Sequence, residues 1–471
     1  MRICLIAEGS YPYVTGGVSS WIHGLMSSMK EHEFIIYAIG AETKQKGKFK
    51  YDLPSNLVEI KEIFLDEYLF EKKKWGKRYN LSSQQKESLI SLLSSNHIVN
   101  WNDLFDLIRS KEFTSVGEFL TSKDYFDLVE HLGKNEYSQV PFTELFWTIS
   151  SMLLPLLSTI RHEIPQADIY HAVSTGYAGV IGALAKHLHN KPLLLTEHGI
   201  YSREREEEII KADWVKGYFK DLWINYFYTL SGSIYTAADQ VITLFNRNKE
   251  IEVELGCPEE KIRIIPNGVE ITDYQDLKSI PDDGVIRIGA IVRVVPIKDI
   301  KTMIQSFALV EKEIPNVELY IMGPVEEDPT YYNECLRMVD EMGIKHIIFT
   351  GMVQIKDYLG RIDFFLLTSI SEGQPLAILE GLACAKPFVC TNVGGCKELL
   401  MGGPDDRYGQ AGFITPVMHY EEIANNILKL CKDQKLREQF GQSGFERVKV
   451  NYKRNEFISS YRQLYQLLGG E

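Results

Sequence analysis

Long hydrophobic runs are missing from this chain of 471 residues. It has no stretch of about 18 or more apolar residues, so the sequence predicts no membrane-spanning helix. The most apolar helical segment, residues 142–160, includes Glu144 and several hydroxyl side chains, and it is interpreted as a buried helix. Met1 and Arg2 lead directly into an apolar strand, so we expect no signal peptide before that strand.

Cysteine is scarce, and its spacing indicates no disulfide framework. The seven cysteines include no C-x-x-C pair, and their number is odd. Zinc sites and disulfide-rich secreted domains usually show close or regular pairs, so we expect reduced thiols in a cytosolic protein. Cys384, Cys390 and Cys396 are evenly spaced and are interpreted as small core residues rather than metal ligands.

A net positive charge, internal repeats and low-complexity segments are also lacking. The net charge of −13 argues against a general nucleic-acid-binding protein. Hydrophobic residues make up 45% of the chain and charged residues 24%, which is ordinary for a globular protein with sizeable cores. The length predicts two or three domains rather than one.

What the sequence does contain is an alternation of short apolar strands and amphipathic helices, which is typical of parallel α/β sheets. Residues 3–7 and 34–39 read as strands on either side of a helix over 18–29, and Gly16-Gly17 stands where the loop meets that helix. Glycines there let backbone N–H groups approach a phosphate closely. The spacing is not G-x-G-x-x-G, and a plain turn is the alternative.

The region from about residue 44 to 165 differs, because it is charge-rich and helical in pattern, and we interpret it as an insertion. It could bind an acceptor or dock a partner, and the sequence does not choose between these roles. Strands resume at 167–172 and 192–196, and the second is followed by His198. Ligands of open α/β sheets bind at such strand exits, although a core or surface histidine is the alternative.

A second α/β region begins after a polar linker over 272–283. Its first strand, 286–292, is followed by Arg293 and, five residues later, by Lys298, which precedes a helix. Two fixed cations beside a helix N-terminus suit a diphosphate, whereas two exposed surface cations are the alternative. Further along, a strand over 364–367 is followed by a polar loop with Glu372, by Pro375 at a helix start, and by Glu380 within that helix.

The string around these glutamates, S-E-G-x-P-L-A-x-L-E-G-L-A, resembles the donor-sugar motif of the retaining glycosyltransferases of family four. Gly16-Gly17-Val18 is similar to the family's G-G-V loop, and residues 349–353 match its F-x-G-x-V strand exit. The Arg293 and Lys298 pair resembles G-R-x4-K, although Val292 replaces the glycine. The I-P-N-G-V turn at 265–269 resembles the family's domain junction.

The resemblance implies the GT-B fold, with two Rossmann-like doubly wound parallel-sheet domains that face a cleft. The expected acceptor domain is 1–275 with the helical insertion at about 44–165 and a crossover helix at 454–471, and the expected donor domain is 276–453. Catalytic roles are implied for His198, Arg293, Lys298 and Glu372. Donor-binding roles are implied for Gly16, Gly17, Arg293, Lys298, Met352, Val353, Glu372, Gly373, Gln374, Pro375, Leu376 and Glu380.

Within the family the likeness is closest to the PelF enzymes of Pel exopolysaccharide synthesis, on Glu8–Trp21 and Thr196–Tyr201. This implies transfer of a hexose or N-acetylhexosamine from a UDP-sugar to a growing polysaccharide in the cytoplasm, beside a membrane-embedded export partner. Because no D-x-D triplet occurs, we expect no metal and no other cofactor. We expect no nucleic-acid partner and no direct membrane insertion. A UDP-sugar epimerase and an inactive nucleotide-binding scaffold are the alternatives.

Overall fold

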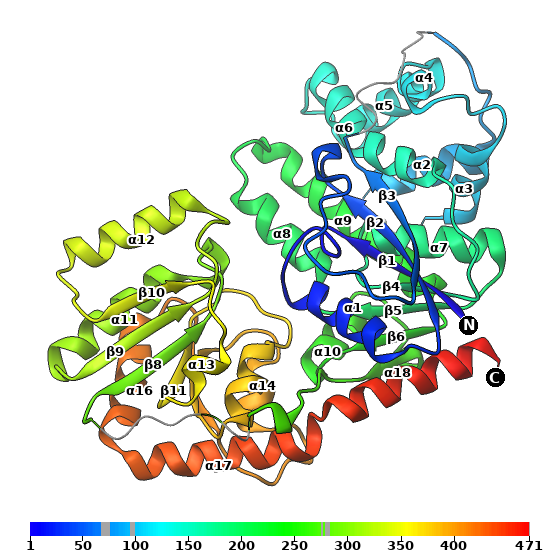
Figure 1. Ribbon diagram of the computed structural model, residues 1–471. Helices are drawn as coiled ribbons and strands as arrows, with labels where there is room; N and C mark the ends of the chain where they lie inside the picture. The colour runs from blue at the N-terminus through cyan, green and yellow to red at the C-terminus, as the bar shows by residue number, and fades with distance from the viewer. Residues whose placement is uncertain (67–75, 95–98, 275–276, 278–282, 471) are drawn as a thin grey trace. The chain divides into compact units, whose positions relative to one another are not determined.

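The chain forms two compact units in the computed structural model, which describes residues 1–66, 76–94, 99–274, 277 and 283–470. The first unit contains residues 1–243 and 249–264 together with the end of the chain from Tyr461, and the second contains 244–248 and 265–460. Each unit is built on one parallel sheet (Figure 1). The predicted pair of parallel-sheet α/β domains is therefore confirmed.

In the described part of the first unit, seven parallel strands lie in the order β3-β2-β1-β4-β5-β6-β7. The order runs outward in both directions from the central pair, which makes the gap between β1 and β4 a topological switch point. The strands are β1 (Arg2–Glu8), β2 (Glu33–Gly40), β3 (Leu57–Phe64), β4 (Ile169–Ala172), β5 (Leu193–Glu197), β6 (Gln240–Thr243) and β7 (Ile262–Ile264).

Both faces of this sheet are covered, which explains why its central strands are apolar throughout rather than alternating. Leu5 of β1 lies opposite His171 of β4, and His171 contacts Trp21 of α1 (Gly17–Ser28) and Tyr465 of α18 (Arg454–Gly469). The neighbouring Cys4 points to the other face, where it joins a hydrophobic core with α7 (Tyr177–His189) and α9 (Gly217–Ala237). The last turns of α18 thus belong to the core of the first unit.

A group of helices packs outside α7 and α9, but it occupies less of the sequence than predicted. The range 44–165 also contains β3, a paired strand of the main sheet whose mixed polar composition concealed it. The helices are α2 (Ser83–Leu93), α3 (Trp101–Arg109), α4 (Val116–Phe119), α5 (Lys123–Asn135) and α6 (Phe142–Arg161). The insertion is therefore corrected to a helical part that begins after β3.

Among the described helices, α6 is long and apolar enough to cross a membrane by length and composition. However, 56% of its most apolar window is buried inside the unit. Leu145, Ile149 and Leu156 belong to the same core as the sheet, which matches the predicted buried helix. Core helices satisfy the same length and composition test, and α6 packs as a core element of the first unit.

In the described part of the second unit, six parallel strands lie in the order β10-β9-β8-β11-β12-β13, with the switch point between β8 and β11. The strands are β8 (Ile286–Ile291), β9 (Val317–Met322), β10 (Ile347–Gly351), β11 (Phe364–Leu367), β12 (Phe388–Thr391) and β13 (Gly412–Thr415). The main helices around them are α11 (Ile300–Glu313), α12 (Pro329–Glu341), α14 (Leu376–Ala383), α15 (Cys396–Met401), α16 (Tyr420–Lys432) and α17 (Gln434–Asn451).

The division between the units falls earlier than the sequence indicated, after Ile264 rather than after residue 275. The backbone N–H of Val269 donates to the carbonyl of Tyr452 at 2.8 Å, and the N–H of Asn267 donates to the side chain of Gln374 at 2.6 Å. These contacts hold the I-P-N-G-V turn within the second unit. Most of the predicted linker, residues 275–276 and 278–282, lies outside the described residues.

Candidate functional site

The predicted donor residues of the second unit follow strands that meet at its switch point. Arg293 and Lys298 follow β8, and Glu372 follows the adjacent strand β11. The two loops are joined directly, because the N–H of Ile370 donates to the carbonyl of Ile297 at 2.9 Å. The carboxyl ends of parallel strands flank the usual ligand crevice of an open sheet, so these residues stand at the expected place.

Lys298 and Glu372 form an ion pair across these loops, with 2.5 Å between Nζ and Oε1. Their side chains are only 16% and 10% exposed, so water screens the pair far less than it screens a surface pair. The hydroxyl of Ser369 donates to the same Glu372 oxygen at 2.6 Å. The structure thus brings together the predicted cation and carboxylate, and Ser369 is a partner that the sequence analysis missed.

Two glycines let neighbouring loops approach the site closely. Gly394 has φ +50°, and a Cβ atom there would lie 2.0 Å from the carbonyl oxygen of Glu372. Gly323 follows β9 with φ +152°, and its Cβ would lie 2.1 Å from the carbonyl oxygen of Val292. A larger residue at either position would displace the backbone that carries Glu372 or Arg293.

Arg293 is paired differently from Lys298. Its guanidinium donates to the carboxylate of Glu327, in the segment between β9 and α12. Both side chains are about one-third exposed, at 34% and 39%, so the pair lies in reach of solvent. Glu327 was not among the predicted residues, because it stands in a short acidic run, residues 326–328, that reads as a solvated loop.

Glu380 lies within α14, where its side chain is partly buried. Burial raises the pKa of its carboxyl group to about 7, although the hydroxyl of Tyr274 and the charge of Lys356 oppose that rise. Tyr274 ends a short 3-10 helix, Ile271–Tyr274, that contacts α14. The sequence analysis assigned Tyr274 to the linker, and no motif signalled its role beside Glu380.

Residues 373–376 form the junction between the Glu372 loop and α14. Pro375 stands immediately before the helix, and Leu376 is its first residue. The first N–H groups of an α-helix have no partner within the helix, which makes this end favourable for an anion. Gly373 accepts a hydrogen bond from the N–H of Gly395 at 2.8 Å, which fixes the loop from the other side.

Gln374 is buried, and its side chain holds the protein backbone. Its Oε1 accepts from the N–H of Asn267 at 2.6 Å, and its Nε2 donates to the carbonyl of Leu244 at 3.2 Å. The side-chain amide therefore fixes the junction turn against the Glu372 loop. If Gln374 contacts the sugar donor, the contact would have to come from its backbone, because its side chain is already hydrogen-bonded to the protein.

Met352 and Val353 follow β10, at the same edge of the sheet. Met352 is 67% exposed, while Val353 is partly buried against the core. Gly351 has φ +67° and turns the chain out of the strand there. The exposed backbone of such a turn can offer its amide groups to a ligand.

Gly16, Gly17 and His198 belong to the first unit, at the carboxyl edge of its sheet. Gly16 precedes α1, and a Cβ at Gly16 or Gly17 would meet no atom within 4 Å, so this helix start is open. His198 follows β5 with its ring 4.7 Å from the Trp21 ring. Burial lowers the pKa of His198 to about 4, and its Nε2 makes no hydrogen bond within the described chain.

His171 has a structural role in the first unit. Its Nδ1 lies 2.7 Å from the Tyr465 hydroxyl and its Nε2 lies 2.8 Å from the Thr196 hydroxyl. Both ring nitrogens are therefore used inside the core. His198 differs from His171, because its Nε2 is buried but has no hydrogen-bond partner among the described residues.

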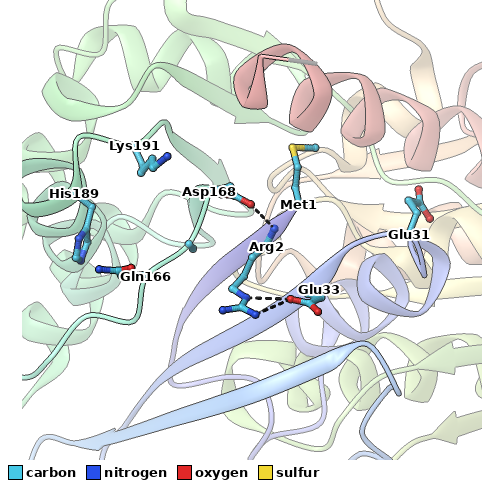
Figure 2. Close-up of a pocket in the computed structure, with 9 residues that line it drawn as sticks. Met1, Arg2, Glu31, Glu33, Gln166, Asp168, His189 and Lys191 are labelled. Atoms are coloured by element: carbon cyan, nitrogen blue, oxygen red, sulfur yellow. Dashed lines mark hydrogen bonds and ion pairs between the residues drawn. The ribbon is translucent and has the colours of Figure 1, made fainter.

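A hollow of about 740 Å³ lies at the opposite, amino edge of the first sheet (Figure 2). Arg2 crosses it, with its guanidinium 2.8 Å from Glu33 and its backbone N–H 2.8 Å from Asp168. Ligands of parallel sheets bind at the carboxyl edge. We therefore do not assign the chemistry to this hollow.

The described residues form no cluster of metal ligands. They contain no group of three or more His, Cys, Asp or Glu side chains arranged to hold a metal ion. The seven cysteines are all free, and six of them are buried. Metal independence stays a prediction that activity measurements must test.

Comparison with known proteins identifies the family. A profile described as "Domain of unknown function (DUF3492)" matches residues 1–260, and one described as "Glycosyl transferases group 1" matches residues 283–433. The chain belongs to the DUF3492 family, and its residues 283–433 form a group 1 glycosyltransferase segment. The switch-point site with Lys298 and Glu372 lies within the matched glycosyltransferase segment of this protein.

Two curated relatives of this glycosyltransferase are similar over part of their lengths. N-acetyl-alpha-D-glucosaminyl L-malate synthase of Bacillus anthracis is 26% identical over 36% of this chain and 42% of that protein. The capsular polysaccharide biosynthesis glycosyltransferase CapM of Staphylococcus aureus is 24% identical over 62% of this chain and 74% of that protein. The chain thus spans less than half of the first relative and about three quarters of the second.

The glycosyltransferase also resembles solved structures over nearly its full length. The crystal structure of Anabaena HepE in complex with UDP has a TM-score of 0.61, with 16% sequence identity, 99% coverage of this chain and 100% of that chain. This likeness concerns the fold, and together with the two parallel-sheet units it assigns the GT-B type. The predicted fold class is confirmed in that respect.

Proposed function

We propose that this glycosyltransferase is a retaining, metal-independent enzyme that transfers a hexose or N-acetylhexosamine from a UDP-sugar to a growing exopolysaccharide. The observation that carries the proposal is the partly buried ion pair of Lys298 and Glu372 at the switch point of the group 1 domain. It supplies a cation for a diphosphate and a carboxylate for sugar hydroxyls in one place.

These groups suggest how the nucleotide-sugar donor would be bound and activated. Lys298 and Arg293 would neutralise the negative charge that develops on the departing diphosphate, with the N-terminus of α14 adding partial positive charge. Glu372 would accept hydrogen bonds from donor hydroxyls, and Glu380 would bind the ribose. Charge stabilisation of this kind needs no metal ion, provided that the cations are fixed as these are.

The anomeric configuration would be retained if the acceptor hydroxyl attacks the sugar on the same face from which the leaving group departs. The departing phosphate oxygen would then take the acceptor proton, so no carboxylate pair of the glycosidase type is needed. His198 supports this route as a neutral group, because its lowered pKa keeps the imidazole uncharged at neutral pH. Its Nε2, which is buried and has no hydrogen-bond partner among the described residues, would bond an acceptor hydroxyl, and the Gly16-Gly17 loop would offer backbone N–H groups to the diphosphate.

The choice of UDP and of a polysaccharide acceptor draws support from relatives. Anabaena HepE was crystallised with UDP, and CapM is named for capsular polysaccharide biosynthesis. The PelF resemblance of Glu8–Trp21 and Thr196–Tyr201 leads us to propose a Pel-like polymer, biofilm exopolysaccharide synthesis in the cytoplasm and a membrane-embedded export partner. The epimerase and the inactive scaffold remain the alternatives, and no contact in the site favours either.

A panel of UDP-, GDP- and ADP-sugars tests the proposal through nucleotide binding and nucleotide release, with and without an oligosaccharide acceptor. We expect release of UDP, faster with acceptor, and retention of the anomeric configuration in the product. Conversion of the donor to its epimer without acceptor would identify the epimerase instead. Full activity after treatment with EDTA is expected, and a strict metal requirement would overturn the metal-free mechanism.

A further inference from the structure

A second hollow of the first unit is lined by aromatic side chains and lies away from the strand exits. Its volume is about 390 Å³, and it is formed by the first half of α6, the segment that joins α8 (Tyr201–Lys211) to α9, and the start of α9. Three tryptophans line it, namely Trp147, Trp214 and Trp223. Trp147 is 52% exposed and Trp214 is 70% exposed, which is unusual for such large apolar side chains.

The indole rings are held in place rather than loosely exposed. The Trp214 ring lies 5.6 Å from the Trp223 ring at 82°, an edge-to-face arrangement. Trp223 in turn stacks on Phe227 of α9 at 5.9 Å. This support leaves a face of Trp214 open to solvent while fixing its orientation, which lowers the entropic cost of binding a flat ligand.

Hydrogen-bonding groups stand beside these rings. Glu144 of α6 forms an ion pair with Lys216 at 2.9 Å and accepts a hydrogen bond from the Tyr218 hydroxyl. Thr148 and Ser151 line the same hollow. Flat aromatic faces next to charged and hydroxyl groups suit pyranose rings, whose C–H faces stack on indoles while their hydroxyls bond polar side chains.

The hollow is connected with the strand exit of His198 through one helix. α8 begins three residues after His198 and ends three residues before Trp214. Its eleven residues span about 16 Å at 1.5 Å per residue. A polysaccharide whose end lies near His198 could therefore reach the tryptophans after several sugar units, within the first unit alone.

We propose that the hollow of Trp147, Trp214 and Trp223 is a secondary glycan site, which binds the growing polymer several units from its reacting end. The inference rests on the proposed function, since it requires a polysaccharide acceptor. A glycan fits better than a lipid surface, because the charged residues that line the hollow, Glu144 and Lys216, pair with each other and offer no excess positive charge to anionic headgroups. By binding beyond the reacting end, the site would favour long acceptors over short ones.

The test measures binding and transfer with oligosaccharides of two to eight units of N-acetylglucosamine and of N-acetylgalactosamine, using the full chain. We expect the wild-type chain to bind the longer oligosaccharides of one series about tenfold more tightly than the disaccharide of that series. Trp214→Ala should abolish that gain, while Trp214→Phe should keep most of it. Tyr420→Ala, which removes an exposed aromatic side chain of the second unit, serves as the matched control.

Three results would overturn the inference. These are an undiminished length dependence in Trp214→Ala, no binding of any oligosaccharide to the wild-type chain, and wild-type binding to phosphatidylcholine–phosphatidylglycerol vesicles that Trp214→Ala loses.

UDP release from the donor by the wild-type chain, measured without oligosaccharide, separates the two proposals. If UDP is released and length dependence is absent, only the glycan site fails. If no UDP-sugar is bound or turned over, the proposed function itself fails.

Discussion

The Nζ atom of Lys298 lies 2.5 Å from Oε1 of Glu372, although the two residues are 74 positions apart in the chain. The pair joins the loops after β8 and β11, the two strands on either side of the switch point in the second sheet. Ser369 donates to the same carboxylate oxygen at 2.6 Å. One hydrogen-bonded group therefore contains both the cation proposed for the diphosphate and the carboxylate proposed for the sugar.

Replacing Lys298 should reduce turnover far more than stability. Lys298→Ala removes the fixed charge that we propose stabilises the departing diphosphate, and losses of such groups cost about 100-fold or more in kcat. Steady-state release of UDP measures the effect. Lys301→Ala is the matched control, because Lys301 is a nearby lysine that pairs with Glu334 at 2.7 Å outside the site. A kcat for Lys298→Ala equal to that of the control would contradict the assigned role.

Glu327 is expected to compete with the donor for Arg293. Glu327→Gln removes the negative charge that the Arg293 guanidinium now binds, so this cation becomes available to a diphosphate. Since partly exposed ion pairs contribute up to about 1 kcal/mol, UDP should bind roughly two- to fivefold more tightly. Calorimetric titration with UDP measures the change.

The control for Glu327 is Glu334→Gln, which removes the same charge from the same unit but from a pair with Lys301. An equal gain in both variants would indicate a general charge effect rather than release of Arg293. A weaker affinity in Glu327→Gln would show that this carboxylate positions Arg293 for the ligand.

UDP affinity should depend on pH through Glu380. Burial raises the pKa of this carboxyl group to about 7, and the ionised form is the better acceptor for ribose hydroxyls. The group changes from mostly neutral to mostly ionised between pH 6 and 8, so its contribution should strengthen binding by up to about tenfold over that range. The measurement is the Kd of UDP against pH, in the wild-type chain and in Glu380→Gln.

Titration of the UDP phosphates affects both chains alike, so the difference between their pH profiles reports on Glu380. Glu380→Gln should show the shallower dependence. Identical profiles would remove Glu380 from the ribose site, even if the variant binds UDP more weakly.

Folding stability should depend on pH through a buried carboxyl pair in the first unit. Glu252 of α10 (Asn246–Glu254) and Glu197 at the end of β5 are almost fully buried. Burial and the nearby Glu197 charge raise the pKa of Glu252 to about 9, and burial raises the pKa of Glu197 to about 7. The folded chain therefore holds more protons than the unfolded chain at intermediate pH.

The protons bound to Glu197 and Glu252 in the folded chain add most to the free energy of unfolding at low pH. This contribution is lost as the pH rises towards 9. Each such group can contribute up to about 1.4 kcal/mol per pH unit in that window. Glu252→Gln should flatten this loss and raise the Tm at pH 8.5 more than at pH 5. Glu250→Gln, an exposed residue of the same helix, should not, and a parallel shift in both variants would contradict the buried-charge explanation.

Much of this architecture could be predicted from the sequence because strand exits carry local signals. Arg293, Lys298 and Glu372 follow apolar runs, so their shared sheet edge could be predicted before any contact was known. The pairing of Lys298 with Glu372 needed the strand order, since β8 and β11 are adjacent only in space. Tyr274 and Glu327 carried no such signal, because each stands in a polar segment that reads as solvated.

The boundaries were harder for the same reason. β3 contains Glu59, Lys61 and Glu62 among its apolar residues, and this mixed pattern hid an outer strand of the sheet. The division between the units depends on long-range contacts of Asn267 and Val269 with residues more than 100 positions away. Local sequence patterns do not contain that information.

A crystal structure of the chain with UDP tests the central claim most directly. The account predicts the diphosphate against the side chains of Arg293 and Lys298 at the N-terminus of α14, with the ribose hydroxyls at Glu380. Nucleotide bound away from these three side chains would contradict it.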